Sequence, residues 1–329
     1  MNKISAATPG LLFCLLGALI AYCLDRAVFI LTGFSSIMLM AIVLGAIVGN
    51  VCRWPARLNP GVRVSALTVL KCGVALLGLS ISVDAIMNLG WKVLLTIVGT
   101  IVTGFLVTIM FGKLLKLSDS QALLIGAGCS ICGAAALGAT YGVVRHKNEH
   151  EFLAAIAIVT AFGTAMIVVG PAIVHSWQPA AAGVFIGAAT HEVSQVVAAG
   201  GIVGATALPV AVATKLGRVL LLAPTAMILS ILERNRTSDS EDTHLPPLIP
   251  SFIIVFIILV IVRSLVNVPP FVLHTTDVMR TIFFATAMFA QGLAVTWGNI
   301  KQAGTRTFLL GFLVSFAVGL VSLVGALSI

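Results

Sequence analysis

The chain has 329 residues, of which 59% are hydrophobic and only 9% are charged. Soluble domains carry about 25% charged residues, so this composition excludes both a water-soluble globule and a disordered chain. The apolar residues suffice for about ten membrane spans of roughly 20 residues each, which leaves no room for a water-exposed catalytic domain. The net charge of +8 comes from Lys and Arg in short loops between apolar runs, which indicates contact with a lipid bilayer and no nucleic acid partner.

Apolar runs separated by short polar loops predict an all-α membrane protein with about 10–11 transmembrane helices. The runs are longer and more continuous than barrel strands of about ten alternating residues. The four Trp all fall at predicted segment ends, as an interfacial belt requires. The expected segments are 10–24, 30–51, 64–83, 91–112, 120–144, 152–174, 180–204, 206–232, 249–268, 277–297 and 305–328.

One long polar stretch, ERNRTSDSEDTHLPPL at 233–248, interrupts this series. It predicts a solvated linker between a first helical bundle, 1–232, and C-terminal helices, 249–329, that complete the fold.

The sequence contains an internal echo. Gly78-Leu79-Ser80-Ile81-Ser82, with Ile86 and Gly90, matches Gly292-Leu293-Ala294-Val295-Thr296, with Ile300 and Gly304. A weaker echo matches Ile125-Gly126-Ala127, which precedes Ser130, with Ile186-Gly187-Ala188, which precedes His191. Because the first pair lies seven segments apart, simple alternation gives the two copies opposite orientations, so the echo favours an inverted repeat. Chance similarity among small and apolar residues is the alternative.

Glu192 is the one acid that lies away from loops and segment ends, in GVFIGAATHEVSQVVAAGGIVG. A charge near the bilayer centre costs at least about 2.5–3.5 kcal/mol, so this carboxylate must be paired, neutralised or exposed to a watery cavity. We predict that Glu192, Gln195 and Thr190 bind a coupling ion and that His191 binds substrate. A satisfied cluster of interhelical hydrogen bonds is the alternative.

Among the 19 basic residues, we expect only Lys71 to lie well inside an apolar run, SALTVLKCGVALLGLSIS. Its distance from the segment end makes snorkelling to the interface awkward. We therefore predict that Lys71 faces the protein interior, where it balances Glu192 or holds an anion.

A third feature is the glycine-rich run GAGCSICGAAA at 126–136. Such glycine density predicts a broken helix, whose free N–H groups would suit an anion; close helix packing is the alternative. The spacing Cys129-x-x-Cys132 fits half of a zinc site, but there is no second pair, so we predict no metal and no cofactor. The residues predicted to line this anion site are Gly128, Ser130, Cys132 and Gly133.

Four motifs together resemble the YeiH-type family of sulfate exporters, in the family's order and over nearly the whole chain. The motifs are LKCGVALLGLSISVDAI (70–86), SICGAAALGA (130–139), THEVSQVVAAG (190–200) and GLAVTWGNIKQAG (292–304). The resemblance implies a bacterial inner-membrane protein. Because that family is grouped with cation/proton antiporter and bile-acid symporter folds, it also implies an inverted-repeat bundle with two discontinuous helices that cross near the midplane. Cys129 departs from the small hydroxyl residue expected there.

The resulting hypothesis is a secondary transporter, and not an enzyme, that exports a small oxyanion such as sulfate or sulfite with H+ or Na+ as the coupling ion. The alternatives with the same fold are a cation/proton antiporter and an organic-anion symporter. A channel, an intramembrane enzyme and a non-transporting receptor are further alternatives. A homodimer fits the sequence as well as a monomer does.

Overall fold

The computed structural model describes residues 3–32, 36–52, 54–80, 90–144, 148–235 and 251–329. Nearly all of them are helical, and this part of the chain contains no strand, which confirms the predicted all-α class. The helices fall on the predicted apolar runs, because a continuous apolar helix bonds its backbone groups within one segment.

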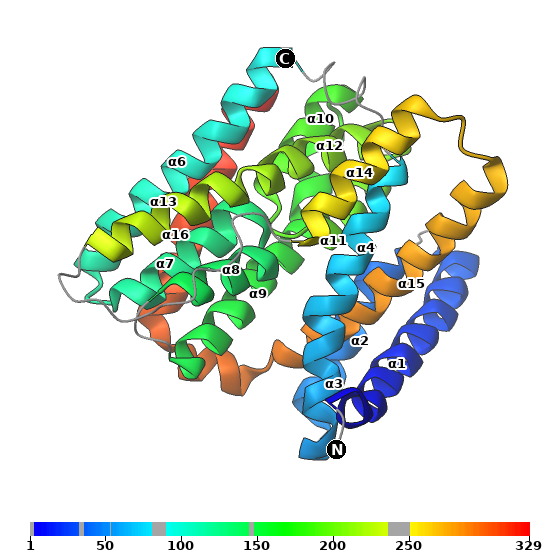
Figure 1. The fold of residues 1–329 in the computed structure, drawn as a ribbon, viewed down its shortest axis with the longest axis horizontal. Coiled ribbons are helices and arrows are strands. Elements are labelled where there is room, and N and C mark those ends of the chain that lie inside the picture. Colours follow the sequence, from blue (N-terminus) through cyan, green and yellow to red (C-terminus); the bar gives the residue numbers. More distant parts are fainter. Residues whose placement is uncertain (1–2, 33–35, 53, 81–89, 145–147, 236–250) are drawn as a thin grey trace.

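The helices pack as two groups, which Figure 1 shows on its right and left sides. The first helical group comprises α1 (Lys3–Thr32), α2 (Ile37–Val51), η1 (Ala56–Leu58), α3 (Asn59–Val64), η2 (Ser65–Val69), α4 (Leu70–Leu76), η3 (Leu77–Ser80), α14 (Ser251–Leu265) and α15 (Pro270–Ala294). The second helical group comprises α6 (Gly90–Leu114), α7 (Asp119–Ala127), η4 (Gly128–Cys132), α8 (Ala134–Val143), α9 (Glu149–Val174), α10 (Pro179–Ala189), α11 (Val193–Val203), α12 (Ala207–Leu220), α13 (Leu222–Asn235) and α16 (Trp297–Leu327).

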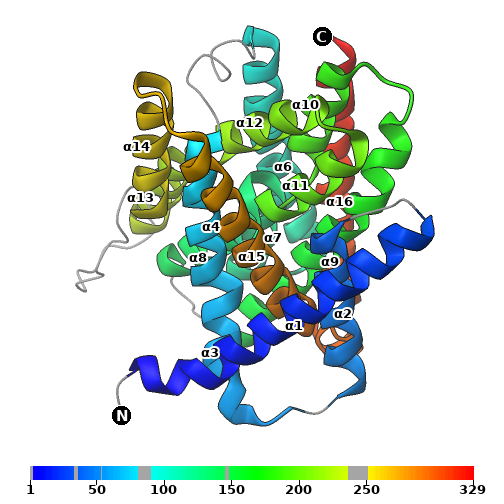
Figure 2. The ribbon, with the colours of Figure 1, turned by 90° about the vertical axis from the view of Figure 1, so that its right-hand side faces the viewer.

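The two groups interleave along the chain, since α14 and α15 join the first group and α16 returns to the second. Figure 2 shows α1 lying across the outside of α15 and α2, against which it packs. The predicted division at 233–248 stays a prediction, because most of that linker lies outside the described residues.

Within the described residues, six helices are long and apolar enough to cross a membrane on their own. These candidate spans are Ala6–Leu31, Ala56–Leu79, Gly90–Leu114, His150–Val174, Ala207–Glu233 and Lys301–Leu327. Other predicted segments form shorter apolar helices, so the expected total of about ten to eleven crossings stays a prediction.

Two predicted segments are interrupted in the middle, as a pair of discontinuous helices requires. The segment 120–144 breaks at Gly133, whose φ of 64° and ψ of −127° suit glycine. The segment 180–204 breaks between α10 and α11, where Thr190 and Glu192 have extended backbones. Each interruption lies a few residues after one copy of the weaker echo, 125–127 or 186–188.

The stronger echo also has a local structural counterpart. Gly90 and Gly304, which occupy matching places in it, have φ values of 76° and 80°. Gly90 begins α6, Gly304 kinks α16, and these two helices pack against each other. Residues 81–89 of the first copy lie outside the described residues, and the inverted repeat itself stays a prediction.

Candidate functional site

The two broken segments meet at their interruptions, so that the ends of four half-helices converge. The backbone N–H of Ala134, at the start of α8, donates to Oε1 of Glu192 over 2.9 Å. Gly133 lies so close to Glu192 that a methyl group at position 133 would overlap the Glu192 side chain. Glu192, which follows the break in segment 180–204, therefore binds the start of α8, which follows the break in segment 120–144.

Glu192 also caps its own helix, α11. Its carboxylate accepts from the N–H of Gln195, and the Gln195 side-chain oxygen accepts from the Glu192 N–H over 3.1 Å. The amide of Gln195 also donates to the carbonyl of Thr160 on α9 over 3.3 Å. A single carboxylate, 1% exposed, thus stabilises the N-terminal ends of both α8 and α11.

The opposite half-helix ends meet Arg218, which is completely buried on α12. Its Nε and Nη2 donate to the carbonyls of Ser130 and Cys129, each over 3.0 Å. Its Nη1 donates to the carbonyls of Ala188 and Thr190. Because the last carbonyls of a helix lack partners within the helix, Arg218 satisfies the C-terminal ends of η4 and α10 together.

Lys215 lies one turn before Arg218 on the same face of α12 and is also completely buried. Its ammonium group donates to the carbonyl of Thr190 over 2.5 Å. An ammonium group has three donors, and the contacts of the described residues use only this one. Lys215 also lies close enough to Glu192 to interact with it electrostatically.

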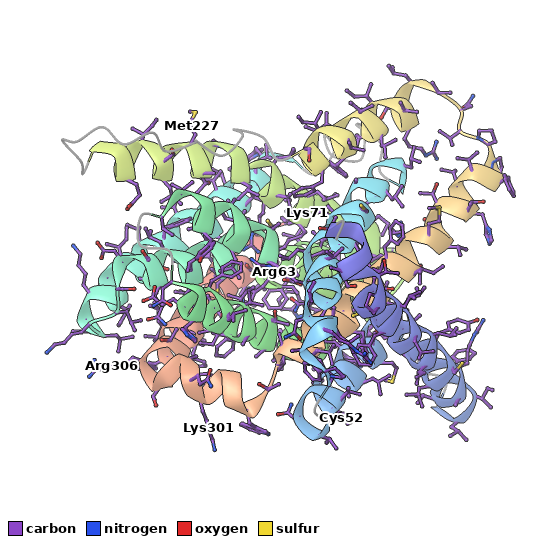
Figure 3. All side chains as sticks on the ribbon, turned by 60° about the horizontal axis from the view of Figure 1, so that its bottom comes forward. Cys52, Arg63, Lys71, Met227, Lys301 and Arg306 are labelled. Carbon is purple, nitrogen blue, oxygen red and sulfur yellow. The ribbon has the colours of Figure 1, made fainter. Side chains whose placement is uncertain are left out.

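The prediction that Lys71 is the only basic residue deep within an apolar run is wrong, because Lys215 and Arg218 are the buried cations. Lys71, labelled in Figure 3, lies on α4; its side chain is half-buried, and its Nζ lies 6.0 Å from the centre of the Phe252 ring on α14. Lys71 belongs to the first helical group, whereas Lys215 and Arg218 lie in the second. Any role of Lys71 in binding an anion stays a prediction.

His191 links the crossing to α16. Its Nε2 shares a hydrogen bond of 2.8 Å with the hydroxyl of Ser315, which in turn lies 3.6 Å from Sγ of Cys129. The ring is completely buried, and its Nδ1 has no hydrogen-bond partner among the described residues. His191 therefore keeps one nitrogen for a further partner.

Several other buried polar atoms near the crossing lack a partner within the described part of the chain. Buried polar groups almost always form hydrogen bonds, so a cluster of unpaired ones indicates bound water, an ion or a ligand. The atoms are the hydroxyl oxygens of Ser130, Thr160, Thr190, Ser194 and Thr214, Oε2 of Glu192 and Oε1 of Gln291.

Two of the N–H groups at the first break already have acceptors, and the binding of an anion by this half-helix end stays a prediction. Gly133 donates to the carbonyl of Gly128 over 3.0 Å, and Ala134 donates to Glu192. Among the predicted ligands, Ser130 and His191 contribute unpaired side-chain atoms, while Cys132 is 4% exposed within the apolar core. The binding roles of all these residues stay predictions.

Sequence reasoning missed Lys215, Arg218, Gln291 and Ser315. The two cations had a visible signal: they lie three residues apart in the apolar run ALPVAVATKLGRVL, the pattern that drew attention to Lys71. Gln291 and Ser315 had none, because isolated polar residues are common in helices. Their helices, α15 and α16, bring them beside Glu192 and His191.

Comparison with known proteins places the chain in a family of membrane proteins. The family model described as conserved hypothetical protein 698 matches residues 9–311. A UPF0324 membrane protein of Corynebacterium glutamicum is 39% identical, over 97% of this chain and 92% of its own. A UPF0324 membrane protein of Pseudomonas aeruginosa is 35% identical, over 95% of this chain and 92% of its own. A third, from Staphylococcus epidermidis, is 29% identical, over 98% of both chains. No solved structure matches.

Proposed function

The chain belongs to the family of conserved hypothetical protein 698 and the UPF0324 membrane proteins, and from this premise we propose that it is a secondary transporter of a small oxyanion such as sulfate or sulfite. The family is one of multi-pass membrane proteins, and the four-motif resemblance to YeiH-type exporters is consistent with it. The proposed site is the crossing of the two broken segments.

One observation carries this proposal: the crossing holds an excess of positive charge next to unpaired hydrogen-bonding groups. Among the described residues of the crossing, two cationic side chains, Lys215 and Arg218, outnumber one carboxylate, that of Glu192. The half-helix ends do not change this balance, since two C-terminal ends contribute about −1 charge and two N-terminal ends about +1. The anion would take the spare donors of Lys215, the hydroxyl of Ser130 and Nδ1 of His191.

Glu192 would couple the anion to a cation. A proton or Na+ bound at Glu192 removes its negative charge, and the neighbouring Lys215 and Arg218 then attract an anion more strongly. Linkage makes this effect reciprocal, so a bound anion favours binding of the cation. The proposed transporter therefore moves the anion and its coupling cation together, in the direction that their combined gradients set.

A cation/proton antiporter of the same fold is a second candidate. It is favoured by the unpaired Oε2 of Glu192 and the unpaired hydroxyls of Thr160 and Ser194, because oxygen atoms of this kind suit Na+. This candidate predicts a sodium-dependent pH change in proteoliposomes that sulfate leaves unaltered.

The direct test is uptake of labelled sulfate by proteoliposomes with an imposed pH or Na+ gradient. Glu192→Gln keeps the shape of the side chain but removes its charge, so transport should no longer respond to the gradient. Lys215→Gln should raise the half-saturating sulfate concentration about tenfold or more, as expected for the loss of a charge-assisted hydrogen bond.

Arg306→Gln is the matched control, because Arg306 is exposed on α16 and its replacement removes the same charge. It should transport sulfate like the parent protein. Gradient-dependent sulfate uptake that survives in Glu192→Gln would remove Glu192 from the mechanism, and a parent protein that moves Na+ but no anion would favour the second candidate.

A further inference from the structure

A cavity lies between the two helical groups, away from the crossing. It has a volume of about 290 Å³, enough for a small oxyanion with several waters. Its walls come from η3, α14 and α15 of the first group and from α11 and α12 of the second. The side chains on the α11 and α12 walls, Val197, Leu208, Pro209 and Val212, are apolar.

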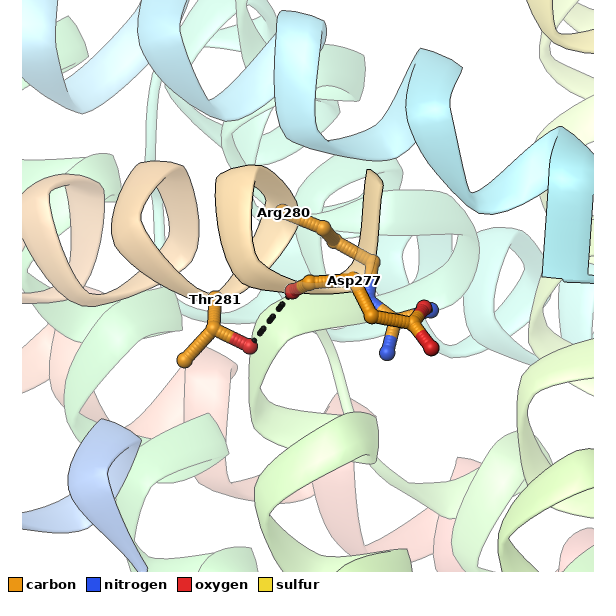
Figure 4. Close-up of polar contacts among 3 residues, drawn as sticks. All are labelled: Asp277, Arg280 and Thr281. Carbon is orange, nitrogen blue, oxygen red and sulfur yellow. Dashed lines mark hydrogen bonds and ion pairs between the residues drawn. The ribbon is translucent and has the colours of Figure 1, made fainter. Parts of the chain in front are cut away.

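The opposite wall carries the charges of the cavity. Arg263 of α14 and Arg280 of α15 both line it, and Asp277 is the only acid among the lining residues that the structure describes. Figure 4 shows Asp277 beside Arg280, with an ion pair of 3.0 Å between Oδ1 and Nη1. The hydroxyl of Thr281 donates to the backbone carbonyl of Asp277 over 2.8 Å, so it does not occupy the carboxylate. Among the described residues, the cavity is therefore lined by two guanidinium groups and one carboxylate.

The Asp277–Arg280 ion pair is one that an incoming anion can replace. The Asp277 side chain is 53% exposed and the Arg280 side chain is 17% exposed. Ion pairs open to solvent contribute about 0–1 kcal/mol, so exchanging Asp277 for a bound oxyanion costs little. Guanidinium groups match the paired oxygen atoms of an oxyanion, which they bind through two parallel N–H donors.

Two helix faces run from this cavity to the crossing. On α12, Leu208 and Val212 line the cavity, and Lys215 follows on the same face. On α15, Arg280 lines the cavity, and the same face continues through the buried Phe284 and Ala287 to Gln291, which lies beside Glu192. Gln291 lies eleven positions after Arg280, which is a distance of about 16 Å along the helix axis.

We propose that this cavity is an access site at which an oxyanion is first captured by Arg263 and Arg280 before it reaches the crossing. Its role in transport rests on the proposed function, but its capacity to bind an oxyanion does not. Capture at this point raises the local anion concentration at the boundary between the two helical groups.

Charge-selective modification of a cysteine tests the cavity without relying on transport. Leu273, a half-buried lining residue on α15, is replaced by Cys in full-length protein whose exposed Cys23, Cys52 and Cys72 are replaced by Ser. Relative to a free thiol, the cysteine should react about tenfold faster with a sulfonate-bearing methanethiosulfonate than with its trimethylammonium counterpart, because a positive cavity concentrates anions. Added sulfate should slow the reaction.

Arg280→Gln or Arg263→Gln in this background should reduce the preference several-fold, whereas the charge-matched Arg306→Gln should leave it unchanged. Equal reactivity with both reagents, or equal effects of Arg280→Gln and Arg306→Gln, would overturn the access site. Leu208→Cys on the facing wall of α12 gives the same test if Leu273→Cys does not fold. A cavity that prefers anions in a protein without sulfate flux would retain the anion site and reject the proposed transport function.

Discussion

The two sides of the helix crossing satisfy their half-helix ends in different ways. On the carbonyl side, Arg218 and Lys215 bond to the carbonyls that end η4 and α10. On the carboxylate side, Glu192 bonds to the N–H groups that begin α8 and α11. Arg218 uses four of its five N–H donors on carbonyls of the protein itself, whereas Oε2 of Glu192 has no partner in the described residues.

This difference separates a structural role from a functional one. A buried charge persists only if hydrogen bonds replace its lost water, and Arg218 meets this condition within the protein. Glu192, Ser130 and His191 keep atoms that nothing in the described structure occupies. The comparison therefore predicts that changes at Arg218 affect folding most, and that changes at the unpaired groups affect ligand binding most.

Arg218→Met should have the largest effect of all. It removes the donor that two half-helix ends share, so the carbonyls of Cys129, Ser130 and Ala188 lose this partner, while Thr190 keeps Lys215. At about 1–3 kcal/mol for each unsatisfied carbonyl, the free energy of unfolding should fall by at least about 3 kcal/mol. Thermal unfolding of the purified protein in detergent measures it, with the exposed Arg306→Met as the control. An unchanged melting temperature would show that the carbonyl side does not hold the crossing together.

Gly133→Ala should destabilise the carboxylate side by about 2–3 kcal/mol, since its backbone conformation suits only glycine and a methyl group would displace Glu192. Gly138→Ala on the same α8 is the matched control, because a methyl group there meets open space. Within a helix, this change should stabilise the protein by about 0.5–1 kcal/mol. Two equal melting temperatures would contradict the tight contact between Gly133 and Glu192.

Ser130→Ala should weaken sulfate transport while leaving stability nearly unchanged, because the hydroxyl has no partner in the described structure to lose. Loss of one neutral hydrogen bond to the anion should raise the half-saturating sulfate concentration about two- to tenfold. Ser322→Ala is the control, since that buried hydroxyl already donates to the carbonyl of Val318 over 2.7 Å. Equal half-saturation in both variants would remove Ser130 from the anion site.

Gly90→Ala and Gly304→Ala should produce the smallest effects. Both glycines have positive φ, and both have open space where a methyl group would lie, so the cost is backbone strain alone, about 1 kcal/mol each. Thermal unfolding of the two single variants should give matching shifts. A large difference between them would indicate that the stronger echo places its two glycines in unlike surroundings.

The class of fold and most helix positions follow from the order of apolar and polar residues along the chain. Long apolar runs have one way to satisfy their backbone in lipid, so length and hydropathy suffice. The glycine density around Gly133 also predicted the first interruption, because this is a local feature of the sequence. A second discontinuous helix was expected only from the family resemblance.

Which groups meet depends on the packing of distant helices. The sequence predicts that Lys71 balances Glu192 or holds an anion, but α4 places Lys71 over Phe252. Instead, α12 places Lys215 and Arg218 at the crossing. The sequence also predicts free N–H groups at the first break, and the fold gives two of them acceptors, the carbonyl of Gly128 and the carboxylate of Glu192. The physical reason is that a half-helix end takes its partner from another segment, and that choice depends on how distant helices pack.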